Sequence, residues 1–339
     1  MDRQALGIAL GVGGALLAGR ALVHASRDYD LDGKIVLITG GSRGLGFAMA
    51  REFARRGARL ALCARDEAEL EEARKRLTEE GADVFCAPCD VTEKEEVEHF
   101  VRRVREEFGQ IDVLVNNAGV FEVGPVETMN LADFEESMQT HFYGPLYMTL
   151  EVLPEMRRRR DGRIVNISSI GGLLAVPHLL PYSASKFALT GLSEGLRAEL
   201  AYENVIVTTV CPGLMRTGSP VHAYFKGHAL AEFRWFLTGA ALPGASMNAD
   251  KAARRVVKAC RRGRAMLILT PHAKLGAKVN RLFPELTSDL MELADRMLPD
   301  SYRAPEEKVE GIDLAPPRGG SLVDRLNRFA ATRLNEYAQ

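Results

Sequence analysis

The chain has 339 residues, of which 46% are hydrophobic and 26% charged, a composition typical of soluble globular proteins rather than of disordered, collagenous or coiled-coil chains. This length holds one large domain or two ordinary ones. The 44 basic and 45 acidic residues give a formal net charge of -1, which disfavours nucleic acid as a partner because proteins that neutralise phosphate backbones are normally basic.

Residues 5–23 are apolar apart from Arg20. As a helix they would span about 28 Å, close to the ~30 Å core of a bilayer. Their glycines disfavour a helix in water but are tolerated in membranes. Three interpretations stay open: a membrane anchor, which places the protein on the cytoplasmic face of a membrane; a helix buried on the protein or in a dimer, which leaves the protein cytoplasmic; and a cleaved export signal, which would be removed.

From residue 34 onward, short apolar runs alternate with helical stretches such as 45–56, 66–80 and 93–108. The predicted strands are residues 34–39, 59–64, 84–88, 112–115, 163–167, 205–210 and 266–269. Nearly continuous apolar strands separated by helices are typical of a parallel sheet that is covered on both faces. We therefore predict an α/β fold with a doubly wound, seven-stranded parallel sheet, in which ligands bind at the carboxyl ends of the strands.

The five cysteines are an odd number scattered along the chain, which is not a disulfide framework and fits a reducing compartment. Cys86 and Cys89 have the C-x-x-C spacing of a redox or metal pair. No second pair or histidine cluster accompanies them, and residues 84–90 read as a strand. We expect both cysteines to be structural and no metal to bind, with a thiol oxidoreductase as the alternative.

Beyond residue 270 the chain reads as a helical extension. Residues 270–300 predict two helices, the second beginning at Pro284. Residues 301–321 are rich in proline, glycine and charge and read as a linker. Residues 322–337 predict a last amphipathic helix that packs on its own domain or on a second subunit, or that alternatively lies on a membrane surface. The expected regions are an apolar N-terminal segment (1–30), a main domain (31–270) and this extension (271–339).

The first predicted strand runs into a glycine-rich turn, Thr39-Gly40-Gly41-Ser42-Arg43-Gly44-Leu45-Gly46, and a helix follows. Glycines at such a turn let a phosphate approach the backbone, and the helix N-terminus offers free N–H groups and a positive dipole end. The spacing matches neither the G-x-G-x-x-G fingerprint nor a Walker loop. At the first strand–helix junction of an α/β chain it indicates a dinucleotide site, with a simple tight loop as the alternative.

Charge near the ribose distinguishes the two nicotinamide cofactors. The second predicted strand ends in Cys63-Ala64-Arg65, without an acidic residue at its tip to hold the 2′-hydroxyl of NAD. The guanidinium groups of Arg43 and Arg65 can hold a 2′-phosphate bidentately. We therefore expect NADP(H) to be preferred over NAD(H). The alternative is that both arginines are solvated surface residues, and Asp66 keeps NAD(H) open.

Tyr182 and Lys186 form a Y-x-x-x-K pair, which on a helix shares one face. An ammonium group beside a phenol favours the phenolate, so the pair can exchange a proton with an alcohol or carbonyl oxygen. Upstream, the fifth predicted strand ends at Ser168 and Ser169, whose hydroxyls are expected at the edge where ligands bind.

Together these motifs resemble the short-chain dehydrogenase/reductase family. The resemblance covers about residues 31–270, and in chain order it rests on Thr39-Gly40-x-x-x-Gly44-x-Gly46, Asp90-Val91, Asn116-Asn117-Ala118-Gly119, Ser169, Tyr182-x-x-x-Lys186, and Pro212-Gly213 with Thr217. It implies a Rossmann-like fold, a dimer or tetramer, and an oxidoreductase that passes a hydride between nicotinamide and a carbonyl or alcohol carbon.

The resemblance also implies a role for each matching residue. Tyr182 would be the general acid/base, Ser169 would hold the substrate oxygen, and Lys186 would bind the nicotinamide ribose and lower the pKa of Tyr182. Asp90 and Val91 would contact the adenine. The residues expected to bind the cofactor are Gly40, Ser42, Arg43, Gly44, Leu45, Gly46, Arg65, Asp90, Val91, Asn117, Ala118, Gly119, Tyr182, Lys186, Pro212, Gly213 and Thr217.

His141 departs from the family pattern, which usually has an asparagine here that holds a water in a proton relay. A histidine can also hold water or relay protons, so our hypothesis is a working relay with an altered pH profile. A buried histidine with slower turnover is the alternative. His141 is also the one feature that favours a non-catalytic NADP(H)-binding scaffold or sensor.

In this family the segment after Pro212-Gly213 closes over the substrate, so we expect a lid at about residues 212–248. It is apolar and includes five aromatic residues, Tyr224, Phe225, Phe233, Trp235 and Phe236. Such a lid favours an apolar substrate, such as a lipid- or steroid-like carbonyl or alcohol compound. The alternative is that these residues pack against a partner subunit or the C-terminal helices.

Overall fold

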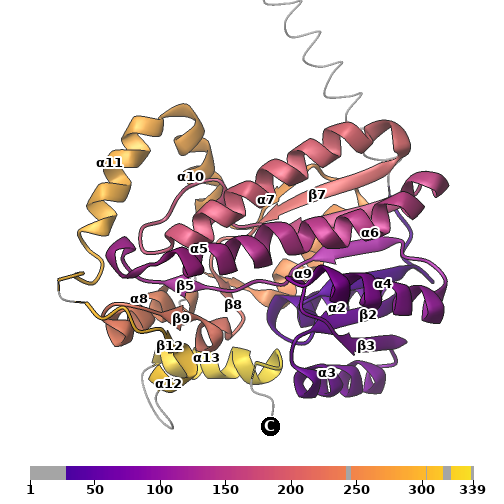
Figure 1. Ribbon diagram of the computed structural model, residues 1–339, viewed down its shortest axis with the longest axis horizontal. Coiled ribbons are helices and arrows are strands. Elements are labelled where there is room, and N and C mark those ends of the chain that lie inside the picture. Colours follow the sequence, from indigo (N-terminus) through magenta and orange to yellow (C-terminus); the bar gives the residue numbers. More distant parts are fainter. Residues whose placement is uncertain (1–27, 242–245, 303, 316–321, 337–339) are drawn as a thin grey trace, which may run out of the picture.

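The computed structural model describes residues 28–241, 246–302, 304–315 and 322–336 (Figure 1). The apolar segment 5–23 lies outside these residues, so its three interpretations remain predictions. Within the described ranges, no helix combines the length and apolar character that crossing a membrane requires.

A central sheet of seven parallel strands confirms the predicted fold. The strands lie in the order β11-β7-β6-β4-β1-β2-β3. Their bounds are β1 Ile35–Thr39, β2 Arg59–Ala64, β3 Val84–Pro88, β4 Val113–Asn116, β6 Gly162–Ile167, β7 Val205–Cys211 and β11 Met266–Ile268. The order reverses between β1 and β4, which is the switch point where α/β sheets open a crevice for ligands.

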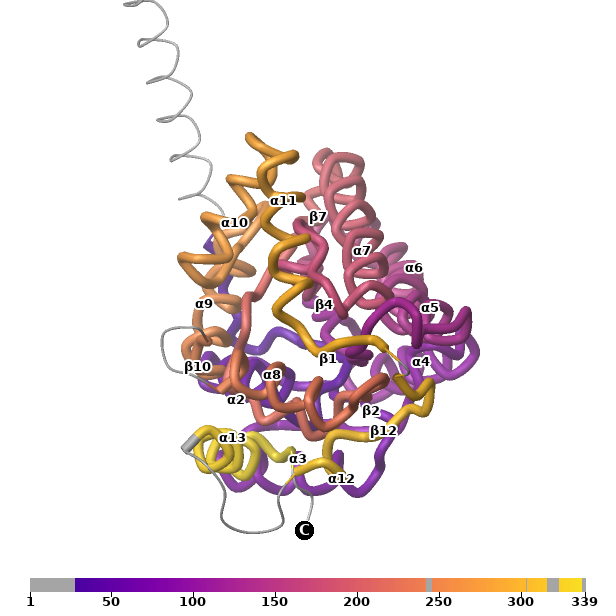
Figure 2. Tube along the Cα trace, turned by 90° about the vertical axis from the view of Figure 1, so that its left-hand side faces the viewer, coloured from indigo at the N-terminus to yellow at the C-terminus, as the bar shows by residue number. Residues whose placement is uncertain are grey.

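Two helical layers cover the sheet (Figures 1 and 2). One face carries α2 (Gly44–Ala54), α3 (Glu67–Glu79) and α9 (Ala249–Arg261), and the other carries α4 (Lys94–Phe108), α6 (Gly144–Arg159) and α7 (Leu180–Glu199). Alternate residues of β1 supply both cores: Val36 and Ile38 face the first layer, and Ile35 and Leu37 face the second. The unbroken apolar runs in the sequence therefore reflect burial on both sides.

Small structures extend the carboxyl edge of the sheet. β8 (Met215–Arg216) pairs with β10 (Met247–Asn248), and α8 (Ala229–Ala241) lies between them in the chain. β9 (Tyr224–Phe225) pairs with β5 (Glu122–Val123) and β12 (Val309–Glu310). The interpretation of residues 301–321 as a linker was wrong in part, because β12 and α12 (Gly311–Leu314) lie within it. β12 is fixed by backbone pairing with β9, which leaves no side-chain pattern to recognise.

The C-terminal helices are α10 (Pro271–Leu282), α11 (Pro284–Asp295) and α13 (Leu322–Arg333). Pro284 begins α11 as predicted, and the apolar stripe that includes Leu286, Leu290 and Leu293 is exposed. α13 lies below α8 and ends beside α3 in both views (Figures 1 and 2). Ala331 and Leu334 are buried, so the prediction that this helix packs on its own domain is confirmed.

Candidate active site

The glycine-rich turn connects β1 to α2 and leaves no room for a side chain at Gly40 or Gly46. A Cβ atom on Gly46 would clash with the carbonyl oxygen of Gly40, whose own φ of +60° suits glycine. The Asn117 amide donates hydrogen bonds of 3.0 Å to the carbonyl oxygens of Thr39 and Gly40. The Thr39 hydroxyl accepts from the N–H groups of Asn117 and Ala118. The end of β4 thus holds the turn in shape.

A second part of the site is a pocket at the carboxyl ends of β2 and β3. Its volume is about 620 Å³, and its walls include Arg65, Asp90, Gln139 and Tyr147. The Asp90 carboxylate accepts hydrogen bonds from the N–H and hydroxyl of Thr92 at 2.9 and 2.8 Å. The structure therefore brings two of the predicted cofactor residues into one pocket at the correct edge of the sheet.

Val91 and Leu45 have mainly structural surroundings. Val91 is buried against Gly144 at the start of α6, where a Cβ atom would come within 2.9 Å of its side chain. Leu45 is buried in the core beneath α2. Any contact of these residues with a cofactor would use their backbone or the edge of their side chains.

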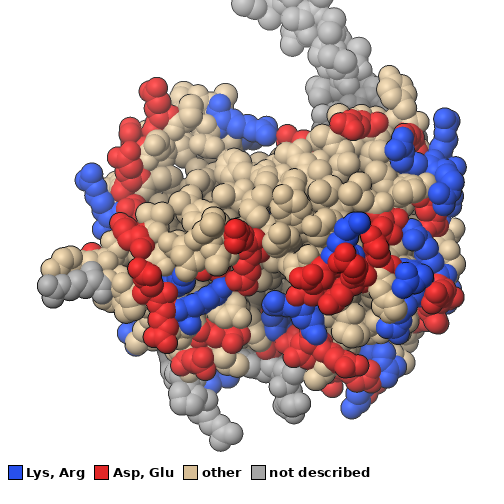
Figure 3. Space-filling model, viewed as in Figure 1, with Lys and Arg blue, Asp and Glu red and all other residues tan. Residues whose placement is uncertain are grey.

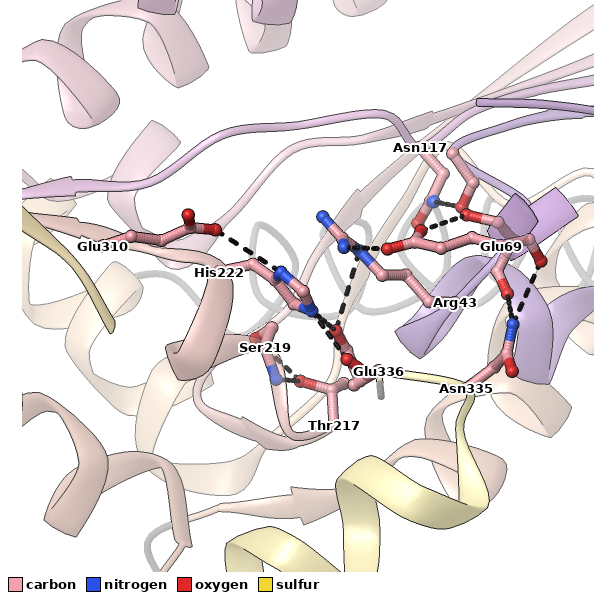
Figure 4. A network of polar contacts seen from close by, with 11 residues as sticks. Arg43, Glu69, Asn117, Thr217, Ser219, His222, Glu310, Asn335 and Glu336 are labelled. Carbon is pink, nitrogen blue, oxygen red and sulfur yellow. Dashed lines mark hydrogen bonds and ion pairs between the residues drawn. The ribbon is translucent and has the colours of Figure 1, made fainter. Parts of the chain in front are cut away.

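Arg43 is held by two carboxylates (Figure 4). Its guanidinium lies 2.6 Å from Glu69 of α3 and 3.7 Å from Glu336 near the C-terminus. Glu69 also accepts a hydrogen bond from the Ser42 hydroxyl at 3.1 Å. Of the two arginines predicted to hold a 2′-phosphate, Arg43 is thus already ion-paired, whereas Arg65 has no such pair among the described residues.

Three predicted catalytic residues lie together where β6 ends and α7 begins: Ser169, Tyr182 and Lys186. The Ser169 hydroxyl hydrogen-bonds the Tyr182 phenol. The Lys186 ammonium donates to the carbonyl oxygen of Ile167 at 3.0 Å and lies 5.6 Å from the centroid of the Tyr182 ring. Burial raises the pKa of Tyr182 to about 12, and the Ser169 hydrogen bond opposes that shift. Burial lowers the pKa of Lys186 to about 7.

His141 lies in a π-helical turn, Gln139–Tyr143, between α5 (Leu131–Met138) and α6. Such turns aim side chains that a regular helix would place elsewhere. Nε2 accepts from the Val120 N–H at 3.1 Å, so Nδ1 carries the proton and donates to the Ser185 hydroxyl at 2.8 Å. Burial and the nearby Lys186 ammonium lower the pKa of His141. Both ring nitrogens therefore have protein partners, which favours the buried-histidine alternative over a relay.

Two further loops border the site. The loop after β4 contributes Gly119, and the loop after β7 contributes Pro212, Gly213 and Thr217. Gly119 packs against the His141 ring, which a Cβ atom would meet at 3.1 Å. The Pro212 carbonyl accepts from the Ile170 N–H at 2.8 Å, and a Cβ on Gly213 would lie 2.6 Å from the Thr270 hydroxyl. Thr217 is buried beside the glycine turn, with its Cβ 3.9 Å from where a Cβ on Gly44 would be.

Aromatic rings form a layer beside Tyr182, with Phe121 next to the tyrosine and the rings of the predicted lid behind Phe121. Phe121, after β4, stacks on Tyr182 with ring centroids 4.7 Å apart, and Phe236 of α8 packs on Phe121 at 5.9 Å. Phe225 and Phe233 are buried behind them, and Trp235 packs edge-on against Phe236. The same apolar cluster includes Leu314 and Val323 of the C-terminal extension.

Sequence reasoning missed Phe121 and a buried pair, His178 and Glu232. The Glu232 carboxylate contacts His178 Nδ1 at 2.8 Å and accepts from Trp235 Nε1 at 2.6 Å, which ties α8 to the loop before Tyr182. No motif singles out these residues, because they come from separate segments. An acidic residue three positions before the single tryptophan was the available signal.

The cysteine pair is structural in its surroundings. Cys86 and Cys89 are free thiols at β3, and burial raises the pKa of Cys86 to about 12, which disfavours a reactive thiolate. Across the described ranges, no cluster of histidine, cysteine and acidic side chains could hold a metal ion.

The glycine-rich turn and the adjoining pocket could hold a dinucleotide, but one backbone group of the turn is already bonded within the chain. The N–H of Gly44 at the start of α2 already donates to the carbonyl oxygen of Leu334 at 2.8 Å. The residues that follow Leu334 lie on the same turn (Figure 4).

Comparison with known proteins shows which family the chain resembles over most of its length. A family model described as short chain dehydrogenase matches residues 34–223, more than half of the chain. A Drosophila melanogaster protein named dehydrogenase/reductase SDR family protein 7-like is 34% identical over 76% of this chain and 78% of its own. A fatty acyl-CoA reductase of Acinetobacter baylyi is 30% identical over 85% of this chain and 94% of its own. The chain spans 62% of the length of an Anopheles gambiae relative, which is 39% identical.

Solved structures show the same fold. A short-chain dehydrogenase/reductase from Burkholderia phymatum in complex with NAD aligns with a TM-score of 0.70 and 25% identity, over 76% of this chain and 96% of its own. L-sorbose reductase from Gluconobacter frateurii, complexed with NADPH and L-sorbose, aligns with a TM-score of 0.64 and 27% identity, over 71% and 97%. With its sheet order, its glycine turn and these alignments, the chain belongs to the short-chain dehydrogenase/reductase family.

Proposed function

We propose that the protein is an NADP(H)-dependent oxidoreductase acting on the carbonyl or alcohol carbon of an apolar substrate, with Tyr182 as general acid/base. One observation carries the proposal: Tyr182, Ser169 and Lys186 converge at the carboxyl edge of the sheet, beside the stacked ring of Phe121.

The protein side of the reaction follows from these contacts. A bound nicotinamide supplies or accepts the hydride. Ser169 holds the substrate oxygen beside the Tyr182 phenol. Because burial raises the pKa of Tyr182 to about 12, the tyrosine is protonated near neutral pH and can donate its proton to a carbonyl oxygen. In the reverse reaction the same group would take the proton back from the alcohol.

The aromatic layer supports an apolar substrate. Phe121 stacks on Tyr182 and Phe236 packs on Phe121, and rings of this kind exclude water from the reacting centre. One relative is named a fatty acyl-CoA reductase, which is consistent with an acyl-chain substrate, whereas a structural neighbour is named for a sugar. We therefore propose a long-chain or steroid-like ketone or aldehyde.

Turnover tests the catalytic assignment. Tyr182→Phe should reduce the rate by about 10²–10⁴-fold on any substrate found in a panel of long-chain carbonyl compounds, since it removes the acid/base group. NADPH binding should persist. The control is Tyr202→Phe, because Tyr202 is 95% exposed and lies beyond the opposite end of α7 from Tyr182. Cofactor binding without turnover in the wild type would instead indicate the scaffold or sensor alternative.

The cofactor preference has its own test. Arg65 lies free in the pocket and supports NADP(H), whereas the pairing of Arg43 with Glu69 favours the second candidate, an NAD-dependent alcohol dehydrogenase. We expect fluorescence titration to show tighter binding of NADPH than NADH, and we expect Arg65→Ala to abolish this difference. Arg254→Ala, an exposed arginine on α9, is the control. Equal binding of the two cofactors by the wild type would favour NAD.

We also propose that residues 5–23 associate with the cytoplasmic face of a membrane and that the protein is a dimer or tetramer. A broad band of uncharged side chains covers α5 and α7 (Figure 3), and Phe187 of α7 and Leu150 of α6 are exposed. Exposed apolar surfaces of this kind are common at subunit interfaces. Sedimentation of the full chain with and without residues 1–27, in detergent and with liposomes, separates the two associations.

A further inference from the structure

The residues that follow α13 lie across the glycine-rich turn (Figure 4). The carbonyl oxygen of Leu334 accepts the Gly44 N–H at 2.8 Å. The Asn335 amide donates to the carbonyl oxygens of Ser42 and Glu69 at 2.9 and 3.1 Å. Residues 334–336, here called the C-terminal plug, therefore contact the turn through its backbone.

Glu336 places a carboxylate at the N-terminus of α2. It is 2% exposed and lies 3.7 Å from Arg43 and 3.5 Å from His222. A Cβ atom on Gly44 would come within 2.7 Å of its Oε1 atom. Its Oε2 atom is buried and has no hydrogen-bond partner. A helix N-terminus with a free N–H and a guanidinium is a site for an anion such as a phosphate.

The plug is held firmly from outside the turn. Arg76 of α3 donates to the Arg333 carbonyl oxygen at 3.0 Å and to the Asn335 side chain at 3.3 Å. Arg333 forms an ion pair with Asp250 of α9. Leu334 is part of the hydrophobic core beneath α2. The docked position is thus built from several elements of the domain.

The groups of the turn that the plug contacts are also the groups that we expect to bind a dinucleotide. The Gly44 N–H and Arg43 are the groups predicted to meet the phosphates of a bound dinucleotide, and here a carbonyl oxygen and a carboxylate occupy them. The pocket near Arg65 and Asp90, in contrast, is open. The plug therefore conflicts with the phosphate part of the cofactor and leaves the adenine part free.

We propose that the C-terminal plug is an autoinhibitory element that competes with the dinucleotide for the glycine turn, so that cofactor binding requires its release. The inference rests on the proposed function, since it needs a dinucleotide enzyme. A binding-competent state that is only partly populated weakens apparent affinity in proportion to its population. Weakening the plug should therefore tighten cofactor binding.

The test compares NADPH and NADH titrations of the full chain with two variants. Asn335→Ala removes one hydrogen bond to the turn at Ser42 and one to Glu69 of α3, and Asn335 has a φ of +60°, which alanine adopts poorly. We expect roughly three- to tenfold tighter binding, and at least as much for a chain that ends at residue 333. Asn204→Ala is a matched control, because Asn204 also has a positive φ and donates to a carbonyl oxygen, far from the turn.

Hydrogen exchange of residues 322–336 provides the second readout. Protection should be present without cofactor and should fall at saturating cofactor. Equal or weaker binding by both plug variants, or protection that cofactor leaves unchanged, would overturn the plug while cofactor binding by the wild type upheld the proposed function. If no variant binds either cofactor, both the plug and the proposed function fail.

Discussion

The ammonium of Lys186 lies 5.6 Å from the centre of the Tyr182 ring, and both groups are buried with their pKa values shifted against ionisation. The cofactor-free chain thus keeps the tyrosine protonated and brings the pKa of the lysine to about 7. Burial is the dominant cause of both shifts.

Lys186 should make the stability of the cofactor-free protein depend on pH. An unfolded lysine has a pKa of about 10.4, so between about pH 7 and about pH 10 the unfolded state binds more protons than the folded state. Stability should therefore rise with pH across this window, relative to Lys186→Met. Urea unfolding at several pH values measures this. Lys75→Met, at an exposed position of α3, should follow the wild type, and identical pH profiles for Lys186→Met and wild type would contradict the shift.

His141 gives a prediction that separates the two interpretations of its position. His141→Asn cannot satisfy both the Val120 N–H and the Ser185 hydroxyl, so it should lower the free energy of unfolding by about 1–3 kcal/mol. Because the burial-lowered pKa keeps this histidine neutral, the shape of the pH–rate curve should not change. A displaced pH–rate curve with unchanged stability would instead support the proton relay.

Two glycine-to-alanine changes, one in the glycine-rich turn and one on α7, should have opposite effects on stability. Gly46→Ala places a Cβ against the Gly40 carbonyl oxygen and should destabilise the turn and abolish cofactor binding. Gly191→Ala adds a methyl group in open space on α7 and should stabilise the protein by about 0.5–1 kcal/mol. Thermal unfolding and cofactor titration of both variants provide the check. Normal cofactor affinity in Gly46→Ala would mean that the turn can widen to accept the Cβ atom without weakening the binding of the cofactor.

Patterns that repeat locally in the sequence predicted most of the fold. The run at residues 84–88 reads as a strand despite its C-x-x-C pair, and it forms β3. The Y-x-x-x-K spacing placed Tyr182 and Lys186 on one helix face, and the glycine turn was predicted at the first strand–helix junction. Each of these features depends on about ten consecutive residues, so it can be predicted from the sequence alone.

Long-range contacts account for what the sequence did not predict. Two-residue strands such as β5, β9 and β12 carry no periodicity and exist only because distant segments pair. Asn335 reaches the Ser42 carbonyl 293 residues earlier in the chain, and nothing near either residue indicates that contact. The stacking of Phe121 on Tyr182 likewise depends on the tertiary fold.

Glu336 should make cofactor affinity depend on pH. Burial raises the pKa of its carboxyl to about 8, with Arg43 opposing and Glu69 adding to the shift. His222, which Glu310 faces at 3.7 Å, lies on the other side of the carboxyl. A released glutamate has a pKa of about 4.3, so between about pH 5 and about pH 8 the docked plug binds more protons than the released plug. Raising the pH through this window should favour release.

We therefore expect NADH to bind progressively tighter to the wild type than to Glu336→Gln as the pH rises from about 5.5 to about 8, because glutamine stays neutral and docked. NADH is the proper ligand here, since it lacks the 2′-phosphate that titrates in the same range. Glu285→Gln, at an exposed position of α11, should retain the wild-type pH profile. Parallel profiles for wild type and Glu336→Gln would show that this carboxyl does not take up a proton when the plug docks.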